Sequence, residues 1–167
     1  MENEKNDEII SYLTFRIGSE MYATHVSVVL NIIELPKITH VPKAPYYMKG
    51  IINLRGMVLP VIDTRIKFGL EETPFTEKTC IIVMDIKIDD QIIHVGMLVD
   101  EVSEVLLIED SQIEPPPSIG NMFKSTIIKG VTKVDDSMIM IIDIVNLFST
   151  LEIDQLSNVQ NESVENI

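Results

Sequence analysis

Residues 57–68 read MVLPVIDTRIKF, and residues 137–148 read SMIMIIDIVNLF. The two stretches match at an offset of 80 positions, and the same offset separates the glycines that precede them, Gly50 and Gly130. Each stretch runs through branched and other apolar residues before it reaches an aspartate, which is typical of a buried strand that ends in a turn. The repeat predicts that one structural unit occurs twice in the chain.

The opening part of each half also has a matching pattern. Residues 12–32 read YLTFRIGSEMYATHVSVVLNI, with a turn expected at 18–20, and residues 80–105 read CIIVMDIKIDDQIIHVGMLVDEVSEV, with a turn expected at 89–91. Both segments therefore predict two strands joined by a tight turn. The composition agrees, because 27 Ile and 16 Val stand against 12 Leu and 2 Ala, and branched side chains favour strands over helices.

These patterns predict an all-β fold of two packed, five-stranded antiparallel barrels with short helices. The first barrel is expected over about residues 9–70 and the second over about residues 80–148, because a short twisted sheet protects its edges best by closing on itself. Residues 69–79, GLEETPFTEKT, have the polar composition of a linker. Neither barrel can bury much core alone, so the seam between them should be apolar.

Both ends of the chain are acidic. Residues 1–8 carry a net charge of −3 and residues 149–167 a net charge of −4. We expect a single domain over residues 9–150, flanked by loose ends at 1–8 and 151–167. The spacing of apolar residues over 144–151 predicts a short helix before this polar C-terminal tail.

The overall charge excludes several classes of partner. The 167 residues include 26 acidic and 13 basic side chains, for a net charge of −13. Nucleic acids and anionic membranes are bound mainly through Lys and Arg, so neither is expected as a partner. No run of 18 apolar residues occurs, and the N-terminus lacks the pattern of a signal peptide. We therefore expect a cytoplasmic protein that does not insert into a membrane.

No motif for a metal or a cofactor occurs. The three histidines, His25, His40 and His94, do not have the close spacing of zinc ligands. The single cysteine, Cys80, begins the apolar run CIIVM, which favours a buried structural thiol over a nucleophile. Glycine-rich phosphate-binding loops are absent from the sequence. We expect no cofactor and no metal.

Two repeat-related aspartates, Asp63 and Asp143, are candidates for acid–base chemistry. A pair of carboxylates that share a proton must approach to about 3 Å, which needs a tight glycine turn. Arg65 and Ile144 stand where such a glycine would be needed. Helix capping by both aspartates is therefore favoured. A small β-barrel hydrolase or ligand-binding protein that uses Asp63 and Asp143 remains the alternative.

The densest local feature is APYYMKGIINLRGMVLPVIDTRIKFG, residues 44–69, which gathers four basic residues in an acidic protein. Arg55 and Gly56 interrupt a strand-like run, so they should form a hairpin turn in which Gly56 has a positive φ. The turn holds either a solvated arginine or an arginine that anchors a partner, a role in which arginine is enriched.

At these residues the chain resembles the CheW-type chemotaxis coupling proteins. The similarity covers about residues 9–150 and includes a YxTFxxG-like opening at 12–18, VPxAPxYxxGIxNLRGxxLPVxDxRxxFG at 41–69 and GxLVDEVxEV at 96–105. The resemblance implies two interlocked SH3-like barrels, no catalysis, and a scaffold role. The partners that it implies are a CheA-type histidine kinase, through its regulatory domain, and the cytoplasmic tips of methyl-accepting chemoreceptors.

The resemblance also implies where the partners bind. Val29, Gly50, Arg55 and Gly56 match positions associated with coupling to the receptor or the kinase, and Asn53 is also expected to bind a partner. A groove edged by Val29, Ile32 and Val99 is expected to accept a receptor helix. Asn31 stands where the family often has glutamate, which favours an apolar or hydrogen-bonded contact at that point. A coupling module fused to a phospho-receiver domain is disfavoured, because no residues remain for a receiver after position 150.

Overall fold

The structure is a computed structural model that describes residues 8–116 and 127–147. These residues form strands with a few short helices between them. In chain order the elements are β1 (Ile9–Ile17), β2 (Glu20–His25), the 3-10 helix η1 (Val26–Val28), β3 (Val29–Glu34), β4 (Met48–Leu54), β5 (Met57–Asp63), α1 (Thr64–Lys67), β6 (Cys80–Ile88), β7 (Gln91–Val99), β8 (Glu101–Glu109), η2 (Asp110–Gln112), β9 (Ile128–Val134), β10 (Ser137–Ile142) and α2 (Ile144–Leu147).

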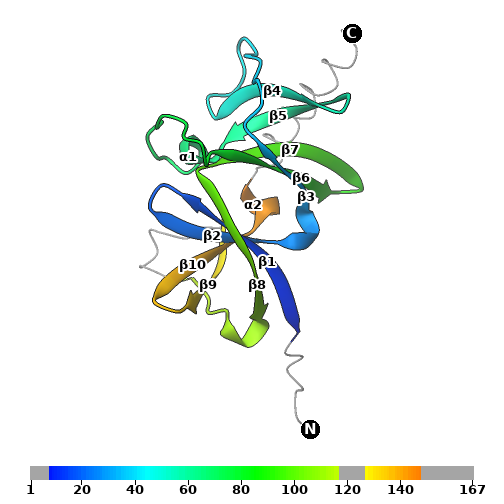
Figure 1. Cartoon of the computed structure of the whole chain (residues 1–167). Helices are drawn as coiled ribbons and strands as arrows, with labels where there is room; N and C mark the ends of the chain where they lie inside the picture. The colour runs from blue at the N-terminus through cyan, green and yellow to red at the C-terminus, as the bar shows by residue number, and fades with distance from the viewer. Residues whose placement is uncertain (1–7, 117–126, 148–167) are drawn as a thin grey trace, which may run out of the picture.

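The strands form two five-stranded sheets, in the orders β8-β1-β2-β10-β9 and β3-β6-β7-β5-β4. Figure 1 shows the second sheet above the first, with α2 between them. This confirms the predicted all-β fold of two five-stranded units with short helices. Within each sheet one pair of strands is parallel, β2 with β10 and β5 with β7. The parallel pairs were not expected; they join strands that no hairpin connects, so nothing requires them to be antiparallel.

The two sheets do not divide at the linker. The sheet of β1 and β2 is completed by β8, β9 and β10, whereas β6 and β7 complete the sheet of β3, β4 and β5. The expectation of one barrel over 9–70 and another over 80–148 must be corrected accordingly. Each half gives its opening hairpin to one sheet and its last three strands to the other. Local sequence patterns identify the strands of each half, but they do not determine which of the two sheets a strand joins.

The repeat itself is present in the structure, because matching strands take the same place in the two sheet orders. Gly50 in β4 and Gly130 in β9 show why a glycine recurs. A Cβ atom added to Gly50 would lie 2.3 Å from the carbonyl oxygen of Thr39. At Gly130 it would lie 2.4 Å from Cγ2 of Ile113. In both halves the preceding loop crosses the strand at this point and leaves no room for a side chain.

The core has three parts. One buried cluster lies in the sheet of β4 and β5 and includes Leu59 and Val83, and a second lies in the sheet of β1 and β2 and includes Tyr12 and Ile141. The largest cluster combines residues of both sheets with two residues of α2. The prediction of an apolar seam between the sheets is confirmed. The seam joins the two units into one body.

The predicted turns are confirmed, since β1 ends at Ile17 and β2 begins at Glu20, while β6 ends at Ile88 and β7 begins at Gln91. The predicted helix over 144–151 is present as far as Leu147, and its remainder lies outside the described residues, as do residues 1–7 and the C-terminal tail. In the described part of the chain, no helix is long and apolar enough to cross a membrane.

Candidate protein-interaction site

Arg55 and Gly56 form the turn between β4 and β5. Both residues have positive φ angles, 52° and 87°, which is the combination found in the tightest hairpins. The side chain of Asn53 reinforces the turn, because its Oδ1 accepts a hydrogen bond from the Gly56 backbone N–H at 2.9 Å. All three residues are exposed. The prediction of a tight turn is confirmed, and the turn carries the arginine into solvent on a stiff backbone.

β3 is an edge strand, paired only with β6 in its sheet. Leu30 and Ile32 point outward, with 50% and 42% of their surfaces exposed, whereas Val29 and Asn31 are half-buried. Oδ1 of Asn31 accepts a hydrogen bond from the Ile32 backbone N–H at 2.9 Å. The strand therefore presents two aliphatic side chains beside an unpaired sheet edge, an arrangement suited to contact with another protein.

Two of the expected contact residues are not accessible. Val99, at the end of β7, is 1% exposed and belongs to the core cluster at the seam. It cannot edge a groove, so that expectation is wrong. Gly50 is also buried, and the close passage of Thr39 leaves no room for a side chain at this position. Both positions can influence partner binding only through the fold.

Asp63 and Arg65 form an ion pair inside the domain. Nε and Nη2 of Arg65 each lie 3.1 Å from a different carboxylate oxygen of Asp63, and the two side chains are 2% and 0% exposed. Burial alone lowers the pKa of Arg65, but hydrogen bonds to Asp63 and the charges of Asp63, Asp100 and Glu72 raise the pKa above its ordinary value. Arg65 is therefore a charged structural residue.

Arg65 also ties distant segments together. Its Nη1 donates to the carbonyl oxygen of Thr73 at 2.8 Å and to the Thr73 hydroxyl, which holds the 69–79 linker against α1. The same nitrogen lies 3.5 Å from Oδ1 of Asp100, between β7 and β8. The second Asp100 oxygen accepts a hydrogen bond from the Gly18 backbone N–H at 2.7 Å. One arginine thus connects the linker, both sheets and the β1–β2 turn.

The two repeat-related aspartates cap helices, as predicted. The Asp63 carboxylate accepts from the Arg65 backbone N–H at 3.1 Å at the start of α1. Asp143 accepts from the Asn146 backbone N–H at 3.2 Å at the start of α2. Both oxygens of Asp63 are occupied by Arg65. The geometry gives no support to acid–base chemistry by this pair.

The histidines and the cysteine have separate local roles. Nδ1 of His25 accepts from the Ser27 backbone N–H at 3.0 Å, and Nε2 of His94 lies 2.8 Å from Oδ1 of Asp85 on the neighbouring strand. Burial raises the pKa of the half-buried Cys80 thiol, with a smaller opposing effect of a backbone hydrogen bond. Among residues 8–116 and 127–147, no three His, Cys, Asp or Glu side chains are placed to hold a metal ion.

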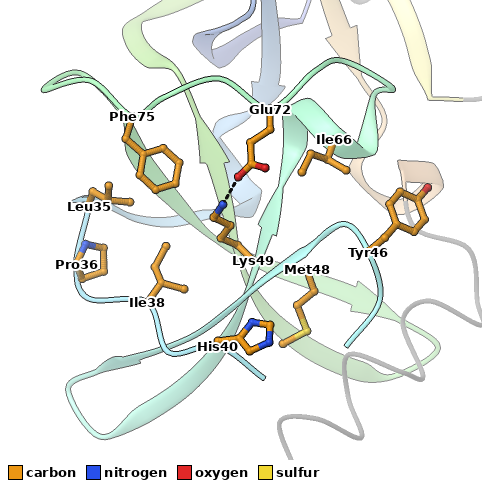
Figure 2. A pocket seen from close by; sticks show the side chains of 10 residues that line it. All are labelled: Leu35, Pro36, Ile38, His40, Tyr46, Met48, Lys49, Ile66, Glu72 and Phe75. Carbon is orange, nitrogen blue, oxygen red and sulfur yellow. Dashed lines mark hydrogen bonds and ion pairs between the residues drawn. The ribbon is translucent and has the colours of Figure 1, made fainter. Parts of the chain in front are cut away.

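A pocket of about 530 Å³ opens between the loop after β3, the start of β4, α1 and the linker. Figure 2 shows the side chains of Lys49 and Glu72, which form an ion pair, extending into it from opposite walls. The other lining residues are the apolar side chains of Leu35, Pro36, Ile38, Met48, Ile66 and Phe75, together with His40 and Tyr46. Residue patterns did not predict this pocket, because its walls come from segments far apart in the chain.

Comparison with known proteins agrees with this architecture. Residues 11–152 match the model of the CheW-like domain. The chain is 35% identical over 150 residues to the probable chemotaxis protein CheW of Rhizobium etli, covering 90% of this chain and 92% of that protein. It is 34% identical over 131 residues to the chemotaxis protein CheW of Bacillus subtilis, covering 78% and 81%.

A solved structure has the same fold. The crystal structure of the scaffolding protein TtCheW from Thermoanaerobacter tengcongensis superposes with a TM-score of 0.75 at 33% identity, covering 86% of this chain and 94% of that one. The match to the family model, over residues 11–152, spans the Arg55 turn and the Asp63–Arg65 pair. The chain therefore belongs to the CheW family of chemotaxis scaffolding proteins, which are not enzymes.

Proposed function

We propose that this chain couples a CheA-type histidine kinase to the cytoplasmic tips of methyl-accepting chemoreceptors, in the cytoplasm at receptor arrays on the inner face of the membrane. Membership of the CheW family supports a role in chemotaxis signalling. The observation that carries the proposal is the exposed Arg55, held on a hydrogen-bonded turn at the tip of the β4–β5 hairpin. Its stiffness reduces the conformational entropy that binding must cost.

The proposed contacts fall into two groups. Arg55, with Asn53 and Gly56, contacts the regulatory domain of the kinase. The outward side chains of β3, Leu30 and Ile32, contact the apolar face of a receptor helix, with Val29 and Asn31 beside them. Each interface buries about 800 Å² per partner or less, which is typical of reversible association. Many copies in an array then supply strength through effective concentration.

Charge reversal at Arg55 tests the kinase contact. Arg55→Glu should weaken binding to the kinase regulatory domain by about 2 kcal/mol or more in calorimetric titration, because an anchor is replaced by a repulsive charge. Unfolding by urea should be unchanged, since the Arg55 side chain is exposed. Wild-type affinity of Arg55→Glu for both the kinase domain and a receptor cytoplasmic fragment would show that this residue is not an anchor.

The repeat supplies a matched control. Asp135 occupies the turn of the β9–β10 hairpin, 80 positions after Arg55, and also has a positive φ, 54°. Asp135→Lys also changes the net charge by two, but in the opposite direction, at the equivalent place in the other sheet. If Arg55 acts through its position and not through net charge, Asp135→Lys leaves kinase affinity unchanged. Titration of the kinase domain into ¹⁵N-labelled chain should perturb amides around Asn53–Gly56.

A further inference from the structure

We infer that the pocket beside Lys49 and Glu72 holds the chain's own acidic C-terminal segment, residues 148–167. The inference is independent of kinase and receptor coupling. It rests on the shape of the pocket, on the charge of the chain segment that supplies one of its walls, and on the composition and tethering of the segment that follows α2.

The pocket has the size and chemistry of a binding site. Its volume of about 530 Å³ falls within the range of roughly 300–1,000 Å³ that is usual for ligand sites, and its lining surface is about half apolar and half polar. Tyr46 at the rim is 77% exposed, and Phe75 on the linker side is 39% exposed. Two exposed aromatic rings around an apolar hollow favour cover by another segment.

The chain segment that supplies one wall of the pocket is basic, in an otherwise acidic protein. Residues 35–49 contain Lys37, Lys43 and Lys49 and no acidic residue, although the whole chain has a net charge of −13. Lys49 pairs with Glu72, so these two charges compensate each other. Lys37 and Lys43 are exposed, and neither belongs to an ion pair of the described residues. Neither lysine lines the pocket itself, but Lys37 lies between the lining residues Pro36 and Ile38, and Lys43 lies between His40 and Tyr46 in the sequence.

The C-terminal segment has the complementary composition. Residues 148–167 contain Glu152, Asp154, Glu162 and Glu165 and no Lys or Arg. Apolar residues alternate with these acids in the first half of the segment, at Phe148, Leu151, Ile153 and Leu156. Such a segment can place apolar side chains against the apolar part of the pocket and carboxylates near Lys37 and Lys43 of the neighbouring loop.

The tether makes the intramolecular contact favourable. The segment starts directly after Leu147, which belongs to the same core cluster as Met48 of the pocket wall. Twenty residues can extend up to about 70 Å, whereas a domain of this size has a radius of gyration of only roughly 14 Å. The segment can therefore reach the pocket, and a short tether gives an effective concentration in the millimolar range. A weak contact is then sufficient for occupancy.

A spin label tests the position of the segment in the full chain. With Cys80→Ala to remove the native thiol and Asn161→Cys to attach the label, the amides of residues 37–43 and 72–75 should lose signal intensity by paramagnetic relaxation. Amides of β8, including Leu107, should not. Raising the salt to about 1 M, where the Debye length falls to about 3 Å, should restore the pocket signals. Uniformly weak relaxation, or relaxation centred on β8, would overturn the inference.

Matched charge variants separate the role of the segment from that of net charge. Neutralising Glu152, Asp154, Glu162 and Glu165 to Gln or Asn in the labelled chain should abolish the relaxation at the pocket. Neutralising the four acids of the N-terminus, Glu2, Glu4, Asp7 and Glu8, removes the same charge and should leave the relaxation unchanged. Lys37→Glu with Lys43→Glu should act like the C-terminal variant. Relaxation that survives neutralisation of the C-terminal acids would contradict the proposed charge complementarity. All of these measurements use the chain alone, so they do not depend on the proposed coupling function.

Discussion

Arg65 donates two hydrogen bonds of 3.1 Å to the carboxylate of Asp63, and both side chains are buried. This pair lies two positions apart in the sequence, at the junction of β5 and α1. The aspartate was a candidate for acid–base chemistry and the arginine one of a cluster of basic residues. Their geometry gives both residues a structural role, since Arg65 also donates a hydrogen bond to Thr73 of the linker and lies near Asp100 between the sheets.

Removal of the aspartate should strongly destabilise the fold. Asp63→Asn leaves the Arg65 charge buried without its main partner, and breaking one side of a buried ion pair costs about 3–5 kcal/mol. Urea unfolding followed by circular dichroism measures the loss. Glu101→Gln serves as a control, because the Arg16–Glu101 pair is more than one-third exposed on both sides and should contribute at most about 1 kcal/mol. Equal losses in the two variants would contradict the structural role of Asp63.

The repeated glycine should tolerate no side chain. Gly50→Ala forces a Cβ atom against the carbonyl oxygen of Thr39, and Gly50 also has a φ of 155°. We expect a loss of at least about 2 kcal/mol in the free energy of unfolding. Gly69→Ala separates contact from backbone strain, because Gly69 has a φ of 78° but a Cβ there would meet nothing within 4 Å. A smaller loss for Gly50→Ala than for Gly69→Ala would refute the explanation by close approach.

Truncation of Ile32 should lower receptor affinity, whereas truncation of Val99 should lower stability. Ile32 is 42% exposed on the edge strand, whereas Val99 is 1% exposed. Ile32→Ser should weaken binding of a receptor fragment by about 1 kcal/mol or more and leave stability nearly unchanged. Val99→Ala should cost about 2 kcal/mol of stability through its cavity and leave the affinity of the folded protein intact. Calorimetry and urea unfolding on both variants measure the two effects; the reverse assignment would place the contact surface elsewhere.

Stability should fall in the alkaline range. Burial raises the pKa of the Cys80 thiol above its ordinary value of 9.0 and that of the Tyr22 hydroxyl above 10.0. The folded chain therefore keeps protons that the unfolded chain releases, and the free energy of unfolding decreases as the pH rises above about 9. Below that pH the contribution is fully present. Cys80→Ala should flatten the decrease that begins above about pH 9 in urea unfolding; an unchanged slope would exclude the thiol as its source.

Local signals in the sequence predicted the strands, their turns and the two capping aspartates. The Arg55–Gly56 turn could be predicted because a glycine between two strand-like runs implies a positive φ. The aspartate caps could be predicted from their position after a strand. These features depend on residues that are close in the sequence, which is why periodicity and turn chemistry were sufficient.

The arrangement that depends on distant residues could not be predicted in the same way. No sequence feature near Val99 distinguishes a strand that ends at an exposed groove from a strand that ends in the buried seam between the sheets. The link from Arg65 to Asp100 joins residues 35 positions apart, and the pocket joins Leu35 to Phe75. The ion pair could have been predicted, because Asp63 and Arg65 lie two positions apart at the start of a helix. The exchange of strands between the halves has no local signature at all.

That exchange also constrains how the protein is made. Because the parallel pairing of β2 with β10 connects residues near the N-terminus to residues 139–141, the first sheet stays open until the ribosome has delivered almost the entire domain. A nascent chain that stops in the linker contains the hairpins β1–β2 and β4–β5 without the rest of their sheets, and β3 without its partner β6. We therefore expect the domain to fold only after its synthesis is almost complete, with neither half able to fold before the other.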